Sequence, residues 1–307
     1  MKILVTGGAG FIGSNIVDAL ILKKHKVVIV DDLSTGNLKN INKKAKFYKF
    51  SVTDREKINN VFKKEKFDTV IHHAAQLDVR KSVENPLFDA DVNIKGSLNI
   101  LEACKNTKVK KIIFASSGGT MYGECPDKAP AETVPANPLS PYGVAKNSVE
   151  NYIKSYSAIY GLKYTVLRYA NVYGPRQDPH GEAGVVAIFI GKMLKNEKVL
   201  IFGNGRQMRD YVFVSDVVNA NLKALSCGNN EMFNIGTQTV LSVNQLAKEI
   251  ATITGYKLKP EHMPKRSGEL FRNFLNISKA KKTLGWKPQV DIQTGLKKTV
   301  EYFMKNK

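Results

Sequence analysis

The sequence is poor in cysteine and has no long apolar run. Its three cysteines, Cys104, Cys125 and Cys227, are too few and too scattered for a disulfide framework or a zinc site, so we expect no metal. No window approaches the roughly 18 consecutive apolar residues of a transmembrane helix, so we expect no membrane partner. The chain opens on the strand-like Met1–Gly7 rather than on a cleavable leader, and we therefore expect a cytoplasmic protein.

Acidic residues are scarce relative to basic ones. The chain has 27 Asp and Glu against 47 Lys and Arg, a formal net charge of +20, and only eight of the basic residues are arginines. Nucleic-acid binding is one interpretation, because neutralising phosphates needs cations. No helix-turn-helix, zinc or RNP-type motif accompanies the charge, so we expect a solvated, lysine-coated surface and no nucleic-acid partner.

The remaining composition is ordinary for a folded chain. Hydrophobic residues make up 43% and charged residues 24%, which excludes a largely disordered or collagen-like protein. A length of 307 residues suits one large domain or two interleaved ones. We find no internal repeat and no low-complexity linker.

Apolar, β-branched runs alternate with helical patterns through the first half of the chain. The predicted strands are Lys2–Val5, Val27–Val30, Phe47–Phe50, Thr69–His72, Lys111–Ala115 and Tyr164–Leu167. The predicted helices lie near 12–23, 55–65, 86–106 and 141–160. Strands that alternate with such helices form βαβ units, which build a parallel sheet with helices on both faces.

The alternation loosens after about Arg168. The predicted elements there are short strands at Val199–Phe202 and Met232–Ile235 and helices near 186–196, 215–226, 242–254 and 291–305. We expect an α/β fold with a Rossmann-type, doubly wound parallel sheet over residues 1–168. A smaller mixed α/β substrate lobe would span residues 169–307 and be partly interleaved with the first domain. Ligands would bind in a cleft at the carboxyl ends of the strands.

A glycine-rich turn follows the first predicted strand and opens the first helix. Gly8, Gly10 and Gly13 satisfy the pattern G-x-G-x-x-G, and Gly7 gives a second, wider spacing. A tight turn, a close approach of the backbone to a pyrophosphate and tight helix–strand packing each require a missing side chain. The helix N-terminus supplies N–H donors and a partial positive charge to the phosphates. The motif therefore predicts a dinucleotide site.

Two acids at the end of the second strand indicate which dinucleotide binds. Asp31 is placed so that its carboxylate can accept hydrogen bonds from both ribose hydroxyls. An acid at this position repels a 2′-phosphate, and Asp32 follows it directly. The sequence therefore favours NAD over NADP.

A second motif lies at the start of the predicted helix near 141–160. Ser140 suits the N-cap and Pro141 suits the first helical position. Tyr142 and Lys146 then stand at i and i+4, one turn apart on the same face. A free phenol, with a pKa of about 10, is a poor base at neutral pH. A cation one turn away and the positive end of the helix lower that pKa, so the spacing predicts Tyr142 as a general base tuned by Lys146.

Four segments together resemble a known family. They are TGGAGFIG, the Tyr142 and Lys146 pair, VNIKGSLNIL around Asn93, and RDYVFVSDV. These segments resemble the extended short-chain dehydrogenase/reductases that act on nucleotide sugars, and within them the UDP-glucose 4-epimerases (UDP-galactose 4-epimerases). The resemblance implies a tightly held NAD, a UDP-sugar substrate and commonly a homodimer. It implies interconversion of UDP-glucose and UDP-galactose by transient oxidation at sugar C4, with the N-acetylated pair as further candidates.

The resemblance also implies a set of cofactor contacts. They are Gly7, Gly10, Phe11, Ile12, Gly13, Asp31, Asp32, Ser51, Val52, Ala74, Ala75, Asn93, Tyr142 and Lys146. Ser51 is a departure, because many relatives carry there an Asp that touches the adenine amine. Contact from Val52 with the adenine becomes relatively more important.

The family's third catalytic residue is a Ser or Thr shortly before a Tyr-Gly pair. The corresponding position here is Gly118, which has no hydroxyl. Ser117 or Thr120 must then supply the hydrogen bond to the reacting oxygen of the sugar, and the sequence leaves both open. The 4,6-dehydratases of the family carry an Asp-Glu pair where Gly119 and Thr120 stand, and elimination of water needs such acid–base groups. This difference favours epimerisation.

Substrate contacts are implied mainly in the second half of the chain. They are Arg80, Ser82, Asn171, Phe202, Arg209, Arg266, Glu269 and Asn273. Arg209 would bind the pyrophosphate, and Arg266 would contact a second phosphate or the ribose; the planar fork of Arg suits phosphates. Asn171 would contact the diphosphate, Phe202 would stack on uracil and Glu269 would bind the uridine ribose. Asn273 stands where strict UDP-glucose enzymes carry a bulky Tyr, so N-acetylated sugars become candidates.

Two rival functions remain at this stage. Within the family, the alternative is a 4-epimerase or a decarboxylase acting on UDP-glucuronate. From a different class, a non-catalytic regulator could keep the fold, but the presence of both Tyr142 and Lys146 argues against it.

Overall fold

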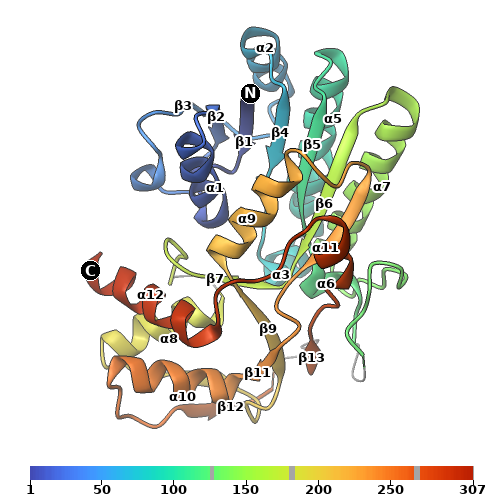
Figure 1. The fold of residues 1–307 in the computed structure, drawn as a ribbon. Coiled ribbons are helices and arrows are strands. Elements are labelled where there is room, and N and C mark those ends of the chain that lie inside the picture. The colour runs from blue at the N-terminus through green and yellow to red at the C-terminus, as the bar shows by residue number, and fades with distance from the viewer. Residues whose placement is uncertain (125–127, 180–183, 266–269, 307) are drawn as a thin grey trace.

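A seven-stranded parallel sheet forms the centre of the protein (Figure 1). The computed structural model describes residues 1–124, 128–179, 184–265 and 270–306. The strands of this sheet are β1 (Lys2–Thr6), β2 (Lys26–Asp31), β3 (Lys46–Lys49), β4 (Thr69–His72), β5 (Lys111–Ser117), β6 (Lys163–Tyr169) and β10 (Glu231–Ile235). Their order is β10-β6-β5-β4-β1-β2-β3, with every neighbouring pair parallel. The order reverses between β1 and β4, which is where ligands bind in such sheets. The predicted doubly wound Rossmann-type fold is confirmed.

Helices cover both faces of this sheet (Figure 1). The helices are α1 (Phe11–Leu22) and α9 (Val214–Ala224) on one face, and α2 (Arg55–Glu65), α5 (Gly96–Asn106) and α7 (Pro141–Tyr160) on the other. Alternate residues of β1 serve the two faces: Ile3 and Val5 join the core under α1 and α9, whereas Leu4 joins the core under α2, α5 and α7. Because both faces are buried, the inner strands are mostly apolar, whereas the edge strand β3 begins and ends on exposed lysines.

The segment predicted as one helix near 86–106 is helical throughout, but one turn of it is π-helical. It contains α4 (Pro86–Ala90), a π-helical turn (Asp91–Lys95) and α5, and it is preceded by α3 (Val79–Glu84). Asn85 separates α3 from α4, since its side chain accepts a hydrogen bond from the backbone N–H of Phe88. A π-helical turn is rare and is frequently found at functional sites.

The smaller lobe is built on short strands from the second half of the chain. One sheet joins β7 (Asn171–Tyr173), β9 (Met208–Phe213), β11 (Val240–Ser242) and β13 (Arg272–Asn273), and another joins β8 (Leu200–Phe202) to β12 (Glu261–Met263). The helices α8 (Val185–Leu194), α10 (Val243–Thr254) and α12 (Ile292–Lys305) pack together beside them (Figure 1). Across the described part of the chain, the helices are too short or too polar to cross a membrane.

Two elements expected in the smaller lobe belong to the large one. The strand predicted at Met232–Ile235 lies in β10, which pairs with β6 at the edge of the large sheet. The helix predicted near 215–226 lies in α9, which packs against α1. Phe233 and Ile235 are fully buried in the same core as Ile3. The chain therefore returns to the first lobe after entering the second.

Candidate active site

The glycine-rich turn after β1 has no room for side chains. Gly7 has a φ angle of +69°, in the left-handed region that favours glycine. A Cβ atom at Gly13 would overlap the carbonyl oxygen of Gly7, so glycine is needed for α1 to start this close to the turn. A Cβ atom at Gly8 would lie 2.8 Å from a side-chain carbon of Ile29 on β2. The turn is therefore fixed by backbone packing.

The N-terminus of α1 faces out of this turn with its N–H donors available to a ligand. Gly10 is the N-cap and contributes no side-chain cap. The first N–H groups of a helix have no partner within the helix, and here Phe11, Ile12 and Gly13 carry them. These donors and the positive end of the helix fit a pyrophosphate.

Asp31 closes the other side of the predicted dinucleotide site. It is buried at the end of β2, and its carboxylate accepts hydrogen bonds from the backbone N–H of Ala9 (2.9 Å) and of Leu33 (2.8 Å). Burial raises the pKa of Asp31, and the two hydrogen bonds oppose that rise. Asp32 is less buried and accepts a hydrogen bond from the N–H of Ser34. The carboxylate of Asp31 therefore lies beside the glycine turn, as binding of a ribose there requires.

A buried hydrogen-bond chain ties the loop after β4 to the end of β1. The Thr6 hydroxyl accepts from the backbone N–H of Ala74 (3.2 Å) and lies 2.6 Å from Nδ1 of His72. Nε2 of His72 lies 2.9 Å from the hydroxyl of Ser97, which donates to the carbonyl of Asn93. Burial lowers the pKa of His72 to about 3, so the ring is neutral. Because the Ser97 hydroxyl donates its proton to the carbonyl of Asn93, it accepts the hydrogen bond from Nε2 of His72. Nδ1 of His72 then accepts from the Thr6 hydroxyl.

The Asn93 side chain holds this same loop. Its Oδ1 accepts from the backbone N–H of Gln76 (3.0 Å), and its Nδ2 donates to the carbonyl of Gln76 (2.9 Å) and to Asp89 (2.9 Å). The amide is therefore engaged with the protein on both atoms. Asn93 was predicted as a cofactor contact, and the structure places it as a support of the loop that carries Ala74 and Ala75.

The predicted adenine contacts follow β3. The Ser51 hydroxyl accepts from the N–H and hydroxyl of Thr53. Val52 is buried, and a Cβ atom at Gly96 would lie 2.7 Å from its side chain. The glycine therefore lets the start of α5 pack closely against Val52. The carbonyl of Val52 accepts from Nδ2 of Asn99 (3.0 Å). Both residues follow the carboxyl end of β3, and their contact with adenine stays a prediction.

Lys146 is a buried cation on the first half of α7. The helix starts as predicted, with Ser140 accepting from the N–H of Gly143 and Pro141 in the first turn. Nζ of Lys146 donates to the carbonyl of Ala115 (3.0 Å) and lies 5.7 Å from the centre of the Tyr142 ring. Only 4% of the residue is exposed, and this burial lowers the pKa of Lys146 to about 8.

Tyr142 shares this site, and its hydroxyl and that of Ser117 are hydrogen-bonded. Burial raises the pKa of Tyr142 above its usual value, the charge of Asp89 raises it further, and the hydrogen bond with Ser117 lowers it. The sequence led us to expect a lowered pKa, because it showed the nearby cation but not the loss of hydration. In the structure the loss of hydration is the larger effect.

The packing around Gly118 explains why the family hydroxyl is missing there. A Cβ atom at Gly118 would lie 2.5 Å from one methyl carbon of Leu275 and 2.8 Å from the other. Gly118 begins α6 (Gly118–Met121), and the preceding residue, Ser117, makes the hydrogen bond with Tyr142. Thr120 has a buried hydroxyl without a hydrogen-bond partner among the described residues, and it lines the adjoining cleft. The geometry therefore favours Ser117 as the residue that contacts Tyr142.

An open cleft lies near these groups. Ser117, Tyr142 and Lys146 are not among the described residues that line it, but their chain neighbours Gly119, Thr120 and Ser140 are. The residues that line it are Val79, Gly119, Thr120, Gly123, Leu139, Ser140, Asn171, Arg209, Leu270 and Asn273. It brings together four of the predicted site residues, from α6, β7, β9 and β13. Arg209 is the cation in this lining, and no carboxylate is among the described residues that form it.

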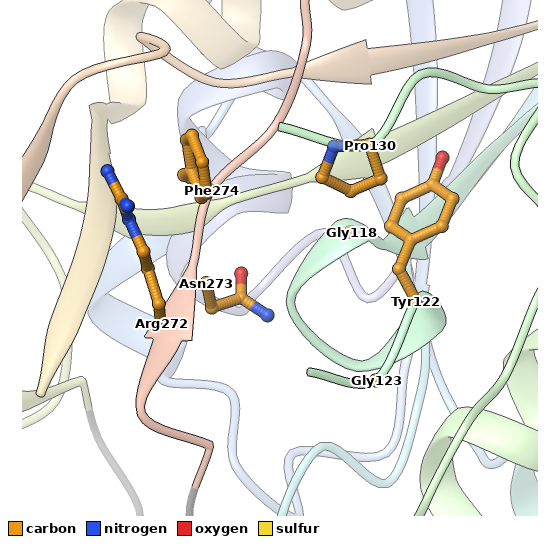
Figure 2. Close-up of a pocket in the computed structure, with 7 residues that line it drawn as sticks. All are labelled: Gly118, Tyr122, Gly123, Pro130, Arg272, Asn273 and Phe274. Carbon is orange, nitrogen blue, oxygen red and sulfur yellow. The ribbon is translucent and has the colours of Figure 1, made fainter. Parts of the chain in front are cut away.

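Asn273 reaches toward α6 from β13. Figure 2 shows its side chain directed at the turn that carries Gly118, next to Arg272 and Phe274. Nδ2 of Asn273 donates to the carbonyl of Gly119 (2.8 Å), whereas its Oδ1 is buried and has no hydrogen-bond partner in the described part of the chain. A Cβ atom at Gly119 would meet nothing nearer than 3.7 Å. Neither packing nor backbone conformation therefore explains the glycine at position 119.

Several of the predicted substrate contacts do not line the cleft or cannot be placed. Ser82 is fully buried, and its hydroxyl donates to the carbonyl of Val79, so its side chain is used within α3. Arg80 is exposed on α3, and Phe202 is half-buried at the end of β8. Arg266 and Glu269 lie outside the described residues.

Sequence reasoning missed two polar residues of this site, Gln76 and Asp89. Asp89 is buried and accepts from Nε2 of Gln76 (2.9 Å) as well as from Asn93. The spacing of Asp89 and Asn93, at i and i+4 around the start of the π-helical turn, was the available signal. Within the described residues we find no cluster of His, Cys, Asp and Glu that could hold a metal ion.

Comparison with known proteins shows similarity over the whole chain. Residues 3–236 match the model of the NAD dependent epimerase/dehydratase family. The chain is 52% identical over 308 residues to a putative UDP-glucose 4-epimerase of Methanocaldococcus jannaschii, covering 99% of each protein. It is similar to the crystal structure of UDP-glucose 4-epimerase with UDP-glucose from Thermotoga maritima, with a TM-score of 0.98 and 53% identity. The match covers 100% of this chain and 99% of that structure's chain.

A second solved structure has the cofactor bound. It is the UDP-glucose 4-epimerase of Thermus thermophilus in complex with NAD, with a TM-score of 0.94, 42% identity and coverage of 99% of each chain. The glycine turn, the open start of α1 and Asp31 fit such a dinucleotide, as described above. The chain belongs to the NAD-dependent epimerase/dehydratase family, and its cofactor is NAD.

Proposed function

We propose that this enzyme interconverts UDP-glucose and UDP-galactose by transient oxidation at C4 of the sugar. The observation that carries the proposal is the grouping of Tyr142, Ser117 and buried Lys146. Their chain neighbours Thr120 and Ser140 line an open cleft. The relatives that match the chain from end to end and are named UDP-glucose 4-epimerases support the same activity.

The predicted cofactor residues would each bind a different part of the dinucleotide. The first turn of α1 would hold the pyrophosphate, Asp31 the adenosine ribose, and Lys146 the ribose next to the nicotinamide. Bound NAD⁺ supplies an acceptor for hydride from a carbon that bears a hydroxyl. The carboxylate of Asp31 repels a 2′-phosphate, which explains the choice of NAD.

Tyr142 serves as the group that moves the proton of the 4-hydroxyl. Its phenolate takes this proton while C4 is oxidised, and the phenol so formed returns the proton when C4 is reduced. Ser117 donates a hydrogen bond to the phenol oxygen and so stabilises the phenolate, and the ammonium of Lys146 lies over the ring. Burial of Tyr142 opposes ionisation, so both neighbouring groups are needed.

The cleft holds the nucleotide more firmly than the sugar. Arg209 and Asn171 line it on the side of the small lobe, where a diphosphate would accept their hydrogen bonds. Epimerisation requires that the oxidised sugar turns over and presents its opposite face. An open cleft with binding groups for the UDP leaves the sugar that freedom.

The lining of the cleft also separates this reaction from its rivals. Elimination of water would need an acid–base pair, and Gly119 and Thr120 stand where dehydratases carry carboxylates. A glucuronate substrate adds a second anionic group, and the one cation among the described lining residues, Arg209, is assigned to the diphosphate. Neutral hexoses therefore fit better than UDP-glucuronate.

Asn273 and Gly119 make N-acetylated sugars candidate substrates. The Oδ1 atom of Asn273 is buried without a partner among the described residues and lies 4.0 Å from the position that a Cβ atom at Gly119 would take. The missing side chain leaves space beside an unused acceptor, which an acetamido N–H would satisfy. Turnover of UDP-glucose and UDP-N-acetylglucosamine measured under the same conditions tests this. A lack of turnover of UDP-N-acetylglucosamine would refute it.

We also propose that the protein is a homodimer. Val83 on α3, Leu87 and Phe88 on α4, and Val144 and Tyr152 on α7 are large apolar residues exposed to solvent. The helices α3 and α4 pack against α7, so these side chains belong to one region of the surface. A second copy that presents the same face would bury them.

A cytoplasmic location is part of the proposal. Cys104 and Cys227 are free thiols, as expected in a compartment where cysteines stay reduced. Cell fractionation of the native host tests the location, and recovery in the extracellular fraction would contradict it.

The decisive experiment is product analysis with UDP-galactose for the wild type and for Tyr142→Phe. We expect the wild type to form UDP-glucose and to reach the same mixture from either sugar, with NAD recovered from the protein. The variant should keep NAD and lose turnover. A non-catalytic regulator would show no turnover in either protein, and a decarboxylase would release CO₂ from UDP-glucuronate without a back reaction.

A further inference from the structure

The ammonium of Lys146 is buried in a site where its nearest carboxylate along α7 is already paired. Glu150 lies one turn further along the helix and receives two hydrogen bonds from Arg168, through Nε (2.9 Å) and Nη2 (2.5 Å). The Ser116 hydroxyl donates to the same carboxylate. Glu150 and Arg168 are both almost fully buried, so their charges cancel locally. A buried cation without a counter-charge is costly, and Lys146 must find one elsewhere.

Asp89 is a buried carboxylate with no cation in hydrogen-bond contact among the described residues. It is 1% exposed, and its Oδ1 accepts from two neutral amides, Nε2 of Gln76 and Nδ2 of Asn93, each at 2.9 Å. Amide N–H donors favour an ionised carboxylate, which is only an acceptor. Asp89 and Lys146 are therefore single, opposite buried charges on α4 and α7, two helices that pack against each other.

The electrostatics of the site couple these two groups. Burial lowers the pKa of Lys146, and the charge of Asp89, followed by that of Glu150, opposes this fall. Burial raises the pKa of Asp89, and its two amide hydrogen bonds and the charge of Lys146 oppose that rise. Tyr142 is the third titratable group that faces them, and Asp89 raises its pKa. The loop after β4 contributes His72 and His73, whose pKa values burial lowers to about 3 and about 4, so both are neutral.

The other charged groups nearby do not replace this pair. From α3, Arg80 and Lys81 are exposed to solvent, and from the π-helical turn Asp91 pairs with Lys95 at the surface. Solvent screens such charges strongly. Among the residues that the structure describes, the buried charges that remain around the phenol are those of Lys146, Asp89 and the Glu150–Arg168 pair.

We propose that Asp89 is the buried counter-charge of Lys146 and a positioning residue for the Tyr142–Lys146 pair. The amides of Gln76 and Asn93 orient its carboxylate, and the same amides fix the loop after β4 on which the cofactor rests. Asp89 keeps the ammonium charged, which the proposed epimerisation requires for the phenolate of Tyr142. The role in catalysis therefore rests on the proposed function, whereas the pairing of charges does not.

The pairing is tested by thermal stability, which needs no turnover. In the full chain with NAD bound, Asp89→Asn leaves Lys146 as an unpaired buried charge and lowers the melting temperature. In the Lys146→Met background, Asp89 is the unpaired charge, so adding Asp89→Asn raises the melting temperature. This reversal of sign is the expected result, with the NAD content of each variant measured alongside. If Asp89→Asn lowers the melting temperature equally in both backgrounds, the two residues are independent and the proposal is wrong.

The effect on catalysis is tested by the pH dependence of turnover. Asn at position 89 keeps an oxygen that accepts from both amides, so the variant retains the local hydrogen bonds. Loss of the negative charge lets Lys146 release its proton at lower pH, and the alkaline limb of kcat moves down by about one pH unit. Asp91→Asn removes a surface carboxylate two residues away and should leave the limb in place.

The outcomes separate the two proposals. Suppose that Asp89→Asn changes the melting temperature in opposite directions in the two backgrounds, but that no UDP-hexose is turned over. The pairing of Asp89 with Lys146 would then stand, and the proposed function would be refuted. Turnover by the wild type with an unmoved alkaline limb in Asp89→Asn would retain the function and refute the role of Asp89 in catalysis.

Discussion

Replacing Ser117 with alanine removes the hydroxyl that hydrogen-bonds the phenol of Tyr142. In the reacting enzyme this bond is made to a phenolate, and hydrogen bonds to charged groups contribute about 1.5–3 kcal/mol. Since about 1.4 kcal/mol is a factor of ten in rate, we expect kcat to fall by roughly 10- to 100-fold. KM should change little, because Ser117 is not among the described residues that line the cleft.

The pH dependence of this variant gives an independent readout. The hydrogen bond from Ser117 lowers the pKa of Tyr142, so its loss raises that pKa. Less phenolate is then present at a given pH, and the acid limb of the kcat profile moves to higher pH. Steady-state assays of UDP-galactose turnover from mildly acidic to mildly alkaline pH would measure both effects.

Two matched variants complete the experiment on Ser117. Ser116→Ala removes the neighbouring hydroxyl, which donates to Glu150 instead of Tyr142, and should leave the acid limb unmoved. Thr120→Val removes the other candidate hydroxyl at nearly constant volume. Wild-type kcat in Ser117→Ala together with a large loss in Thr120→Val would refute the reasoning and assign the role to Thr120.

Three further predictions concern packing, pH and assembly. Gly118→Ala should destabilise the fold by about 1–3 kcal/mol through its clash with Leu275, whereas Gly119→Ala should be neutral in thermal melts; equal melting temperatures for the two variants would contradict this. Two lysines and Tyr48 lower the pKa of Glu65 to about 2, so its stabilising effect is present above the unfolded pKa and lost as the pH falls toward 2. The drop in melting temperature on going from neutral to acidic pH should therefore be smaller in Glu65→Gln, and an unchanged drop would count against the assignment. Phe88→Glu should convert a dimer into a 34.1 kDa monomer in sedimentation analysis, and a wild-type monomer would refute the proposed interface.

The first half of the fold was predictable because its signals are local. The run KILVT at β1 is apolar and β-branched, and the helical pattern of α7 starts with Ser140 and Pro141. Each strand lies close in sequence to the helix that covers it, so periodicity places both. The glycine turn was predictable for the same reason, since its constraints come from Gly7 and Gly13 themselves.

The remainder depends on contacts between distant segments. The strands β7, β11 and β13 have two or three residues, too few to show a period, and they form only because β9 lies between them. The absence of a hydroxyl at Gly118 was visible in the sequence, but its cause, Leu275, follows much later in the chain. The raised pKa of Tyr142 depends on burial, which no local pattern reveals.

The most direct test of the central claim follows the hydrogen on C4 of the sugar. UDP-galactose that carries deuterium at C4 would be converted by the wild type, and the product analysed by mass spectrometry and NMR. Transient oxidation with a cofactor that stays bound predicts UDP-glucose with the deuterium still on C4 and none in the water. Loss of the deuterium to solvent during conversion would show that a proton is removed from C4, and would contradict the account.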